Sequence, residues 1–267
     1  MDRVELNKAS IDNLCSFWKS TGCLKLGDTD HGTTQHLNIS KTWPHRYWLD
    51  WDGISKHLPD LVAASEWAVS NGGVLTPAWG GDEAIRVKFE QTLSELGYEF
   101  RFLQTQMYLD MTTYCPQRVS QSTPPIQVSR ATLPEEILIF CAICGSAFAY
   151  DIDIESILAS SENPDTHILV AYNSEGSPVA TVILFQTGNI IGVHQVGVSP
   201  QHRRQGIAKE VMIQALAMGN SLLRDQQQAD KTEHPGYMTL QAGEAAKGLY
   251  STLGFKEQFV YKNFLKQ

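Results

Sequence analysis

The sequence has no hydrophobic run long enough to cross a membrane. Its most apolar stretch, Ile137 to Tyr150, has about 14 residues, whereas a spanning helix needs roughly 20. The first residues, Met-Asp-Arg-Val-Glu-Leu-Asn, also lack the apolar run of a secretory signal. These two absences argue against a membrane partner and lead us to expect a cytoplasmic protein.

An excess of positive charge is also missing. Lys and Arg total 21 and Asp and Glu total 29, which gives a formal net charge of -8. A general nucleic-acid binder needs a basic surface that displaces counterions from phosphates. We therefore expect no nucleic-acid partner.

The five cysteines do not have the spacing of a metal site or of a disulfide framework. An odd number of cysteines is typical of a reducing compartment. Cys141 and Cys144 are separated by two residues, but a redox or zinc role would need a helix N-terminus or a second pair of ligands. Because the segment 138–144 has a helical core pattern, we interpret both as buried thiols and expect no metal cofactor.

A polar, proline-rich segment at 114–125 divides the chain. Pro124 and Pro125 cannot continue a helix, and they disfavour a central strand. We predict a linker there, with one domain at 1–113 and another at 126–267.

Beyond the linker, helix and strand signals alternate. Turns rich in Gly and Asn at 173–176 and 187–189 join strands into an antiparallel meander. The expected fold class is α/β (α+β), with a mixed, mostly antiparallel sheet flanked by helices. The sequence predicts helices at 133–148, 152–160, 206–223 and 244–253, and strands at 127–130, 167–172, 179–186, 190–198, 237–242 and 257–265.

The clearest chemical signal follows the strand at 190–198. This strand gives way at Pro200 to a basic turn that contains Gly206, and a long helix begins there. The first amides of a helix lack internal partners and carry partial positive charge, so this geometry can hold a pyrophosphate. Gly206 lets a phosphate approach the backbone, and Ala208 allows close packing. The alternative is an ordinary strand–turn–helix with a solvated basic corner.

Two segments in order resemble the GCN5-related N-acetyltransferase (GNAT) family. Arg203-x-x-Gly206-x-Ala208 is similar to the acetyl-CoA signature Q/R-x-x-G-x-G/A, and 249–255 is similar to a second family segment downstream. The resemblance covers about 126–267. It implies the acyl-CoA N-acyltransferase fold, with acetyl-CoA as the co-substrate.

The resemblance gives each matching position a role. Backbone at Val196, Gly197 and Val198 would bind the pantetheine and polarise the thioester carbonyl. Gly243 and Glu244 depart from the Ser or Asn that often contacts CoA in the family, which affects one side-chain contact. Backbone amides and basic side chains would hold the pyrophosphate at Arg203, Arg204, Gln205, Gly206, Ile207, Ala208 and Lys209.

Two residues are candidates for proton transfer. Tyr250 matches the family tyrosine that protonates the leaving CoA thiolate, and a phenol with a pKa of about 10 suits that role. His194 resembles a histidine of the serotonin N-acetyltransferase branch, and an ordinary histidine pKa suits a general base. The alternatives are a tyrosine that packs a helix onto the sheet and a packed or exposed strand histidine.

The resemblance implies an amine acceptor, on a small molecule or a peptide, that attacks acetyl-CoA directly. The expected acceptor region contains Phe148 and Tyr150 beside Asp151, Asp153 and Glu155. Acids beside aromatic rings could hold a cationic amine, but acids are also favourable at the start of a solvated helix. The alternative functions are a catalytically silent CoA-binding sensor and a transferase that uses another acyl-CoA or acceptor.

The first half of the chain ends with an echo of the last part. Phe89–Tyr98 and then Gln104–Met111 repeat the order helix, Leu-Gly-aromatic, strand that is found at Leu249–Phe264. Gly72-Gly73 and Gly80-Gly81 lack the basic partner of a phosphate turn. We therefore predict a tandem arrangement, in which the first half is a degenerate, CoA-free copy that covers or shapes the acceptor site.

Overall fold

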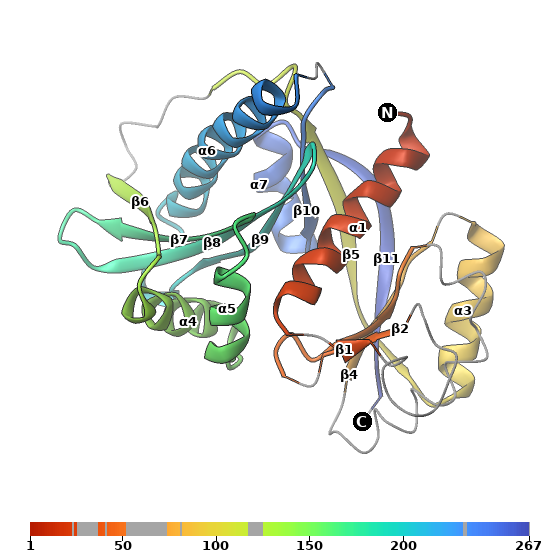
Figure 1. Cartoon of the computed structure of the whole chain (residues 1–267). Coiled ribbons are helices and arrows are strands. Elements are labelled where there is room, and N and C mark those ends of the chain that lie inside the picture. The colour runs from red at the N-terminus through yellow and green to blue at the C-terminus, as the bar shows by residue number, and fades with distance from the viewer. Residues whose placement is uncertain are drawn as a thin grey trace.

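The computed structural model describes residues 1–22, 24–25, 37–40, 42–51, 74–80, 82–116, 125–231 and 234–266. Within them, an 8-stranded sheet has the strand order β4-β11-β5-β10-β9-β8-β7-β6 (Figure 1). Neighbouring strands are antiparallel except β9 and β10, which are parallel, so the expected mixed, mostly antiparallel sheet is confirmed. The bounds are β4 Val74–Ala78, β5 Glu99–Asp110, β6 Ile126–Arg130, β7 Thr166–Asn173, β8 Pro178–Thr187, β9 Ile190–Val198, β10 Tyr237–Ala242 and β11 Lys256–Lys266.

A smaller 3-stranded antiparallel sheet lies in the first half of the chain. Its strands are β1 Leu24–Lys25, β2 Leu37–Ile39 and β3 Tyr47–Leu49. Arg46, next to β3, forms an isolated bridge with Leu75 of β4, which links the small sheet to the large one.

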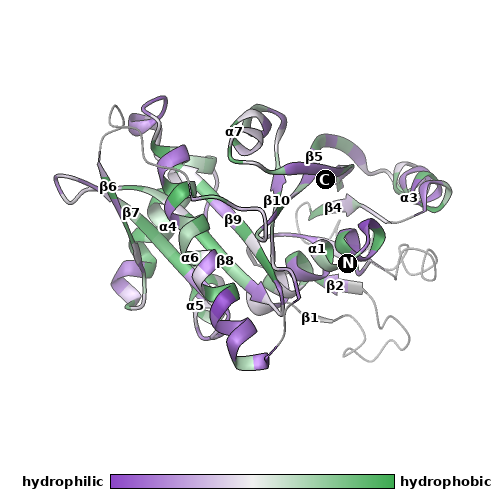
Figure 2. Ribbon diagram, turned by 90° about the horizontal axis from the view of Figure 1, so that it is seen from above, coloured by the Kyte–Doolittle hydropathy of each residue, from purple (hydrophilic) through white to green (hydrophobic). Residues whose placement is uncertain are grey.

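Helices cover both faces of the large sheet. Ile168 and Val170 of β7 pack in a cluster with residues of α1 and α4, whereas the alternating residues Leu169 and Ala171 pack with residues of α6 and α7. β7, β8 and β9 are therefore hydrophobic along most of their length (Figure 2). The helices are α1 Arg3–Ser20, α3 Glu83–Glu95, α4 Pro134–Phe148, α5 Ile154–Ser161, α6 Ile207–Asp230 and α7 Lys247–Thr252.

The predicted elements of the second half form within a few residues of their expected ends, with two differences. α6 continues past the predicted end at 223 to Asp230. The prediction ended too early because the last turns of this helix are polar and carry no apolar pattern. The helix predicted at 244–253 is a 3-10 turn, Glu244–Ala246, followed by the short α7.

The predicted buried thiols are confirmed. Cys141 and Cys144 lie buried in α4, and burial raises the pKa of each thiol to about 12. Among the described residues, no cluster of His, Cys, Asp or Glu has the arrangement of a metal site. No helix in the described ranges is both long and apolar enough to cross a membrane.

The large sheet continues across the predicted domain boundary. β5, from the first half, lies between β10 and β11 and pairs with both of them. The two echoing segments thus end in neighbouring antiparallel strands, β5 and β11. The domain bounds and the degenerate copy stay predictions. Residues 117–124 of the predicted linker and Gly72-Gly73 lie outside the described residues.

Candidate active site

The parallel strands β9 and β10 separate partway along their length. They pair only from Ile190 with Tyr237 to Gly192 with Thr239. The separation begins after Gly192, earlier than at the predicted Val196–Val198. Further along, β9 carries a bulge against β8 near Gln195, whose φ is 51°. A bulge bends its strand and re-aims the neighbouring side chains. The result is an opening in the sheet with unpaired backbone along β9.

A cavity of about 360 Å³ lies at this opening. Three predicted site residues of the second half line it, namely His194, Val196 and Tyr250. The first half also contributes to the wall, through Phe17 and Trp18 of α1 and through residues of β5. The cavity is therefore shaped by both halves of the chain; that it is the acceptor site stays a prediction.

Tyr250 faces the cavity from α7. Its side chain is held by an edge-to-face contact with Phe255, whose ring centroid is 6.0 Å away. Burial raises the pKa of the Tyr250 phenol to about 12. Within the described part of the chain, the hydroxyl makes no hydrogen bond. The phenol therefore keeps its proton at neutral pH and has it available for a group in the cavity.

His194 is buried in the cavity wall. Its ring stacks on Phe17 of α1, with centroids 4.4 Å apart and planes 5° apart. Burial lowers the pKa of His194 to about 3, although a hydrogen bond with Gln241 opposes this shift. The imidazole is thus neutral near pH 7 and is a weak proton acceptor. The general-base role stays a prediction, and the low pKa does not favour it.

Asn13 of α1 reaches the same place and was not found from the sequence. Its Nδ2 donates to the Phe185 carbonyl at 3.0 Å and to Thr187 Oγ1 at 2.9 Å, which anchors α1 on the sheet. Among the residues that the structure describes, neither Asn13 Oδ1 nor His194 Nε2, both buried, has a hydrogen-bond partner. They lie 2.1 and 2.3 Å from the position that a Cβ would take at Gly192, so this position requires glycine.

The predicted phosphate turn has unpaired backbone amides. Gly206, with a φ of 81°, precedes α6, and no side chain caps the helix. The first backbone hydrogen bond runs from the Glu210 amide to the Gly206 carbonyl at 3.2 Å, so the amides of Ile207, Ala208 and Lys209 have no partner inside the helix. Such an end fits the pyrophosphate of a nucleotide carrier.

The side chains of the turn serve partly to fix it. Arg203 donates to the carbonyls of Ala147, at 2.6 Å, and Val198, at 3.2 Å, and so fastens the turn to the end of α4. Arg204 has a φ of 63° and is exposed, and Gln205 donates to the Gln201 carbonyl at 3.4 Å. The predicted contact between the Arg203 side chain and a phosphate stays a prediction.

Gly197 lets α4 pack closely on β9. A Cβ at Gly197 would lie 2.8 Å from Ala147 Cβ and 3.1 Å from Phe148 Cε2. We expect Gly197→Ala to lower the free energy of unfolding by about 1–3 kcal/mol, because the helix must move outward. Urea denaturation measures this change. Gly248→Ala is the control, since no atom lies within 4 Å of its Cβ position; an equal loss there would contradict the packing argument.

The acids considered for amine binding lie outside the cavity wall. Asp153 caps α5 by accepting from the Ser156 amide at 2.9 Å, so the helix-start interpretation is confirmed for it. Asp151 and Glu155 are exposed. Phe148 and Tyr150, in contrast, do line the cavity.

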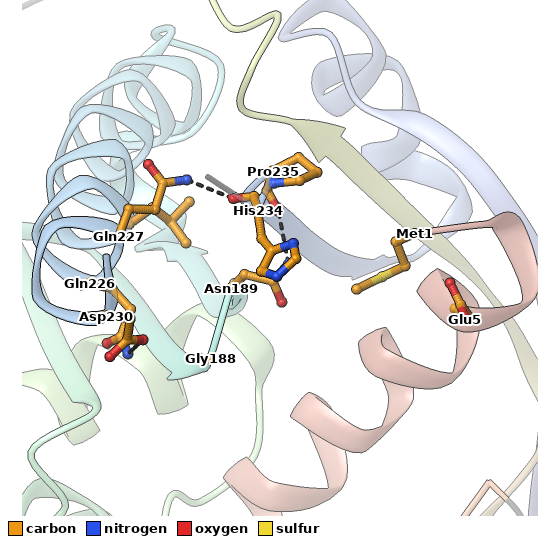
Figure 3. A pocket seen from close by; sticks show the side chains of 10 residues that line it. Met1, Glu5, Gly188, Asn189, Gln226, Gln227, Asp230, His234 and Pro235 are labelled. Carbon is orange, nitrogen blue, oxygen red and sulfur yellow. Dashed lines mark hydrogen bonds between the residues drawn. The ribbon is translucent and has the colours of Figure 1, made fainter. Parts of the chain in front are cut away.

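A second cavity, of about 470 Å³, lies beside the end of α6 and the start of α1 (Figure 3). Gln227 donates to the His234 carbonyl, and Asn189 donates to the Pro235 carbonyl, each at 2.8 Å. No predicted site residue lines this cavity.

Comparison with known proteins agrees with this geometry. Residues 164–257 match the family model described as an acetyltransferase (GNAT) domain, and this range includes the α6 turn and Tyr250. A comparison with curated proteins found no match.

Several solved structures have a similar fold. A GCN5-related N-acetyltransferase from Kribbella flavida is 18% identical, with 82% of this chain and 77% of that chain covered and a TM-score of 0.51. Another, from Sphaerobacter thermophilus, is 14% identical, with 86% and 75% covered and a TM-score of 0.58. A tandem GNAT protein from the clavulanic acid biosynthesis pathway is 11% identical, with 86% and 77% covered and a TM-score of 0.53. At these identities the likeness is one of fold, and the expected N-acyltransferase fold is confirmed.

Proposed function

The second half of this chain carries a GNAT domain, a kind of domain that transfers acyl groups from acyl-CoA, and on this premise we propose that the protein is an acetyl-CoA-dependent N-acetyltransferase. The acceptor is a primary amine, on a small molecule or a peptide. The proposed catalytic acid is Tyr250, and the proposed acetyl-CoA site is formed by Val196–Val198 and 203–209.

One observation carries this proposal. The amides at the start of α6 that have no partner inside the helix follow directly after β9 in the chain. β9 also forms one side of the opening in the sheet, where it separates from β10. A carrier with its pyrophosphate on these amides can extend its pantetheine arm along the unpaired edge of β9. The thioester would then reach the cavity that Tyr250 faces.

The reaction needs little from the protein beyond positioning and one acid. The amine nitrogen forms a bond to the thioester carbonyl carbon, and the carbon–sulfur bond breaks. Backbone amides of β9 would stabilise the charge on the carbonyl oxygen. The Tyr250 hydroxyl would give its proton to the departing sulfur, and the proton that the amine loses would return to the phenol through solvent.

An amine panel with labelled acetyl-CoA tests the proposal. We expect acetyl transfer to at least one class of amine, with one thiol released for each product formed. CoA binding without turnover on any amine would support the silent sensor instead. Competition between acetyl-CoA and longer acyl-CoAs tests the alternative donor.

His194 provides a prediction about pH. Its pKa in the folded state is about 3, below the ordinary value of about 6.5, so the unfolded chain binds more protons between these values. The contribution of the neutral His194 to the free energy of unfolding is therefore fully present above about pH 6.5, and it is lost as the pH falls toward 3. We expect His194→Gln to flatten this loss in urea titrations from pH 7 to 4. An unchanged slope in His194→Gln would contradict the burial argument.

A further inference from the structure

Arg46 brings a positive charge into the acceptor cavity from the first half of the chain. Its guanidinium lines the cavity and lies over the Trp18 ring, with Cζ 4.8 Å from the ring centroid. The backbone is held in place, because the Arg46 carbonyl accepts from the Ser40 amide at 2.8 Å. The side chain is thus presented to the cavity by an ordered segment.

The hydrogen-bonding capacity of Arg46 is mostly unused. A guanidinium has five N–H donors. Nη1 donates to Asn263 Oδ1 at 3.3 Å, whereas Nε is buried and has no partner among the residues described. In the described ranges, no carboxylate lies within ion-pair distance of Arg46. A buried charge without a partner destabilises the folded protein. A guanidinium in this position is therefore a candidate for binding an anionic ligand.

Neighbouring side chains hold the guanidinium in one orientation. Asn263 is fully buried, and its Nδ2 donates to Gln104 Oε1 at 3.1 Å. The Tyr261 hydroxyl donates to the same oxygen at 3.0 Å. With its own donors directed away, Asn263 offers an acceptor to Arg46 Nη1. In the described ranges, Nη2 and Nε of this cavity-lining residue have no hydrogen-bond partner and are left for a ligand.

The positive charge in the cavity disfavours acceptors that carry a second cationic group. Among the described residues that line it, Arg46 carries the only formal charge, since His194 is neutral near pH 7. The remaining wall is aromatic, apolar or amide. A second cationic group on the acceptor would be repelled there, whereas an anionic group would pair with Arg46 in surroundings of low dielectric constant.

We propose that Arg46 binds a carboxylate of the acceptor, so that the substrate is a small aminocarboxylate such as a free amino acid. This inference rests on the proposed function and names the substrate class of the same site. A planar guanidinium matches a carboxylate with two parallel hydrogen bonds. Such pairing would fix the amine relative to the thioester. The cavity volume of about 360 Å³ suits a small molecule more than a peptide chain.

Matched pairs of amines that differ only in the carboxylate test this proposal. The pairs are L-phenylalanine with phenethylamine, L-tryptophan with tryptamine, and glycine with glycinamide. We expect kcat/KM with labelled acetyl-CoA to be roughly 100-fold higher for the carboxylate in the pair that reacts best. In Arg46→Met this preference should disappear, and Arg46→Lys should keep part of it. Equal or faster acetylation of the uncharged partners by the wild-type protein would overturn the assignment.

Calorimetry gives a readout that does not depend on turnover. With saturating CoA, N-acetyl-L-phenylalanine should bind at least about 10-fold more tightly than N-acetylphenethylamine, and Arg46→Met should remove the difference. If no amine reacts but this difference is present, the transferase proposal fails and the carboxylate site stands. If neither product binds, or both bind equally, the carboxylate site fails.

Folding of the variants is checked with CoA affinity and thermal stability. Arg46→Met removes a buried charge that has no counter-ion in the described ranges, which offsets the loss of the hydrogen bond to Asn263, so we expect it to fold with a thermal stability close to that of the wild type. Arg101→Met is the matched control, because Arg101 lies on β5 in an exposed ion pair with Glu99 at 3.4 Å. Its preference for carboxylates should equal that of the wild type; a loss in both variants would show that Arg46 does not act through the cavity.

Discussion

Replacing Tyr250 by Phe lowers kcat for acetyl transfer by about 10²- to 10⁴-fold and leaves the affinity for acetyl-CoA nearly unchanged, if the phenol is the acid that protonates the sulfur. Phe keeps the ring and its contact with Phe255, so the packing of α7 on the sheet is preserved. Only the proton donor is lost. Steady-state kinetics and calorimetric binding of acetyl-CoA separate the two effects.

Tyr237→Phe is a suitable control. Tyr237 is also buried, and its ring lies 6.3 Å from that of Tyr108, outside the cavity wall. Turnover should be close to that of the wild type. Equal losses of turnover and of acetyl-CoA affinity in Tyr250→Phe would mean that the tyrosine only packs the helix.

The pH profile adds a second check on Tyr250. Because burial raises the pKa of the phenol to about 12, the acid stays protonated through the alkaline range. Turnover by the wild type should therefore not fall with a pKa near 10, the ordinary value of tyrosine. A fall with such a pKa that is absent from Tyr250→Phe would show that the phenol is more exposed than the structure indicates.

The second half of the fold could be predicted in detail because its signals are local. The strand at 190–198, the turn at Gly206 and the strand at 237–242 are each defined by residues that are close in sequence. Apolar alternation, a basic glycine turn and a helical stripe suffice for such elements. The turn that would bind the carrier is one of them, so it was found from the sequence alone.

The rest of the cavity depends on contacts that no local pattern encodes. Asn13 and Phe17 appear in the sequence as residues of an amphipathic helix, yet they lie against His194 in the middle of the second half. Arg46 sits in a segment rich in tryptophan, where a basic residue predicts nothing specific. α1 is anchored directly on β8 and β9, and Arg46 is bridged to β4 at the edge of the sheet beside β11. Contacts between segments so far apart in the chain are not readable from hydrophobic periodicity.

The same limit applies to the pKa of His194. From the sequence, a strand histidine has an ordinary pKa and is a plausible base. Burial lowers that pKa to about 3, and Phe17 of α1 is one of the residues that cover the ring. A residue that is distant in the chain thus changes the chemistry that the local sequence suggests.

Gly206→Ala should weaken acetyl-CoA binding by roughly 10- to 100-fold, which corresponds to the loss of one or two hydrogen bonds to a charged group. Gly206 has a φ of 81°, which a residue with a Cβ adopts only with strain. The added methyl would also lie next to the amides of Ile207 and Ala208, on which the proposed pyrophosphate would bind. Calorimetric titration with CoA measures the change directly, without any need for a known acceptor.

Gly206→Ala has two effects, the backbone strain of an alanine at positive φ and the loss of the phosphate site. A substitution at Gly176 measures the backbone strain alone. Gly176 has a φ of 79° in the exposed turn between β7 and β8, and no atom lies within 4 Å of its Cβ position. Gly176→Ala therefore carries a similar backbone cost without a ligand nearby, so it should lower stability by about 1–2 kcal/mol and leave CoA affinity unchanged. If Gly206→Ala loses only stability, the amides of α6 do not hold the pyrophosphate, and neither the transferase nor the sensor retains its cofactor site.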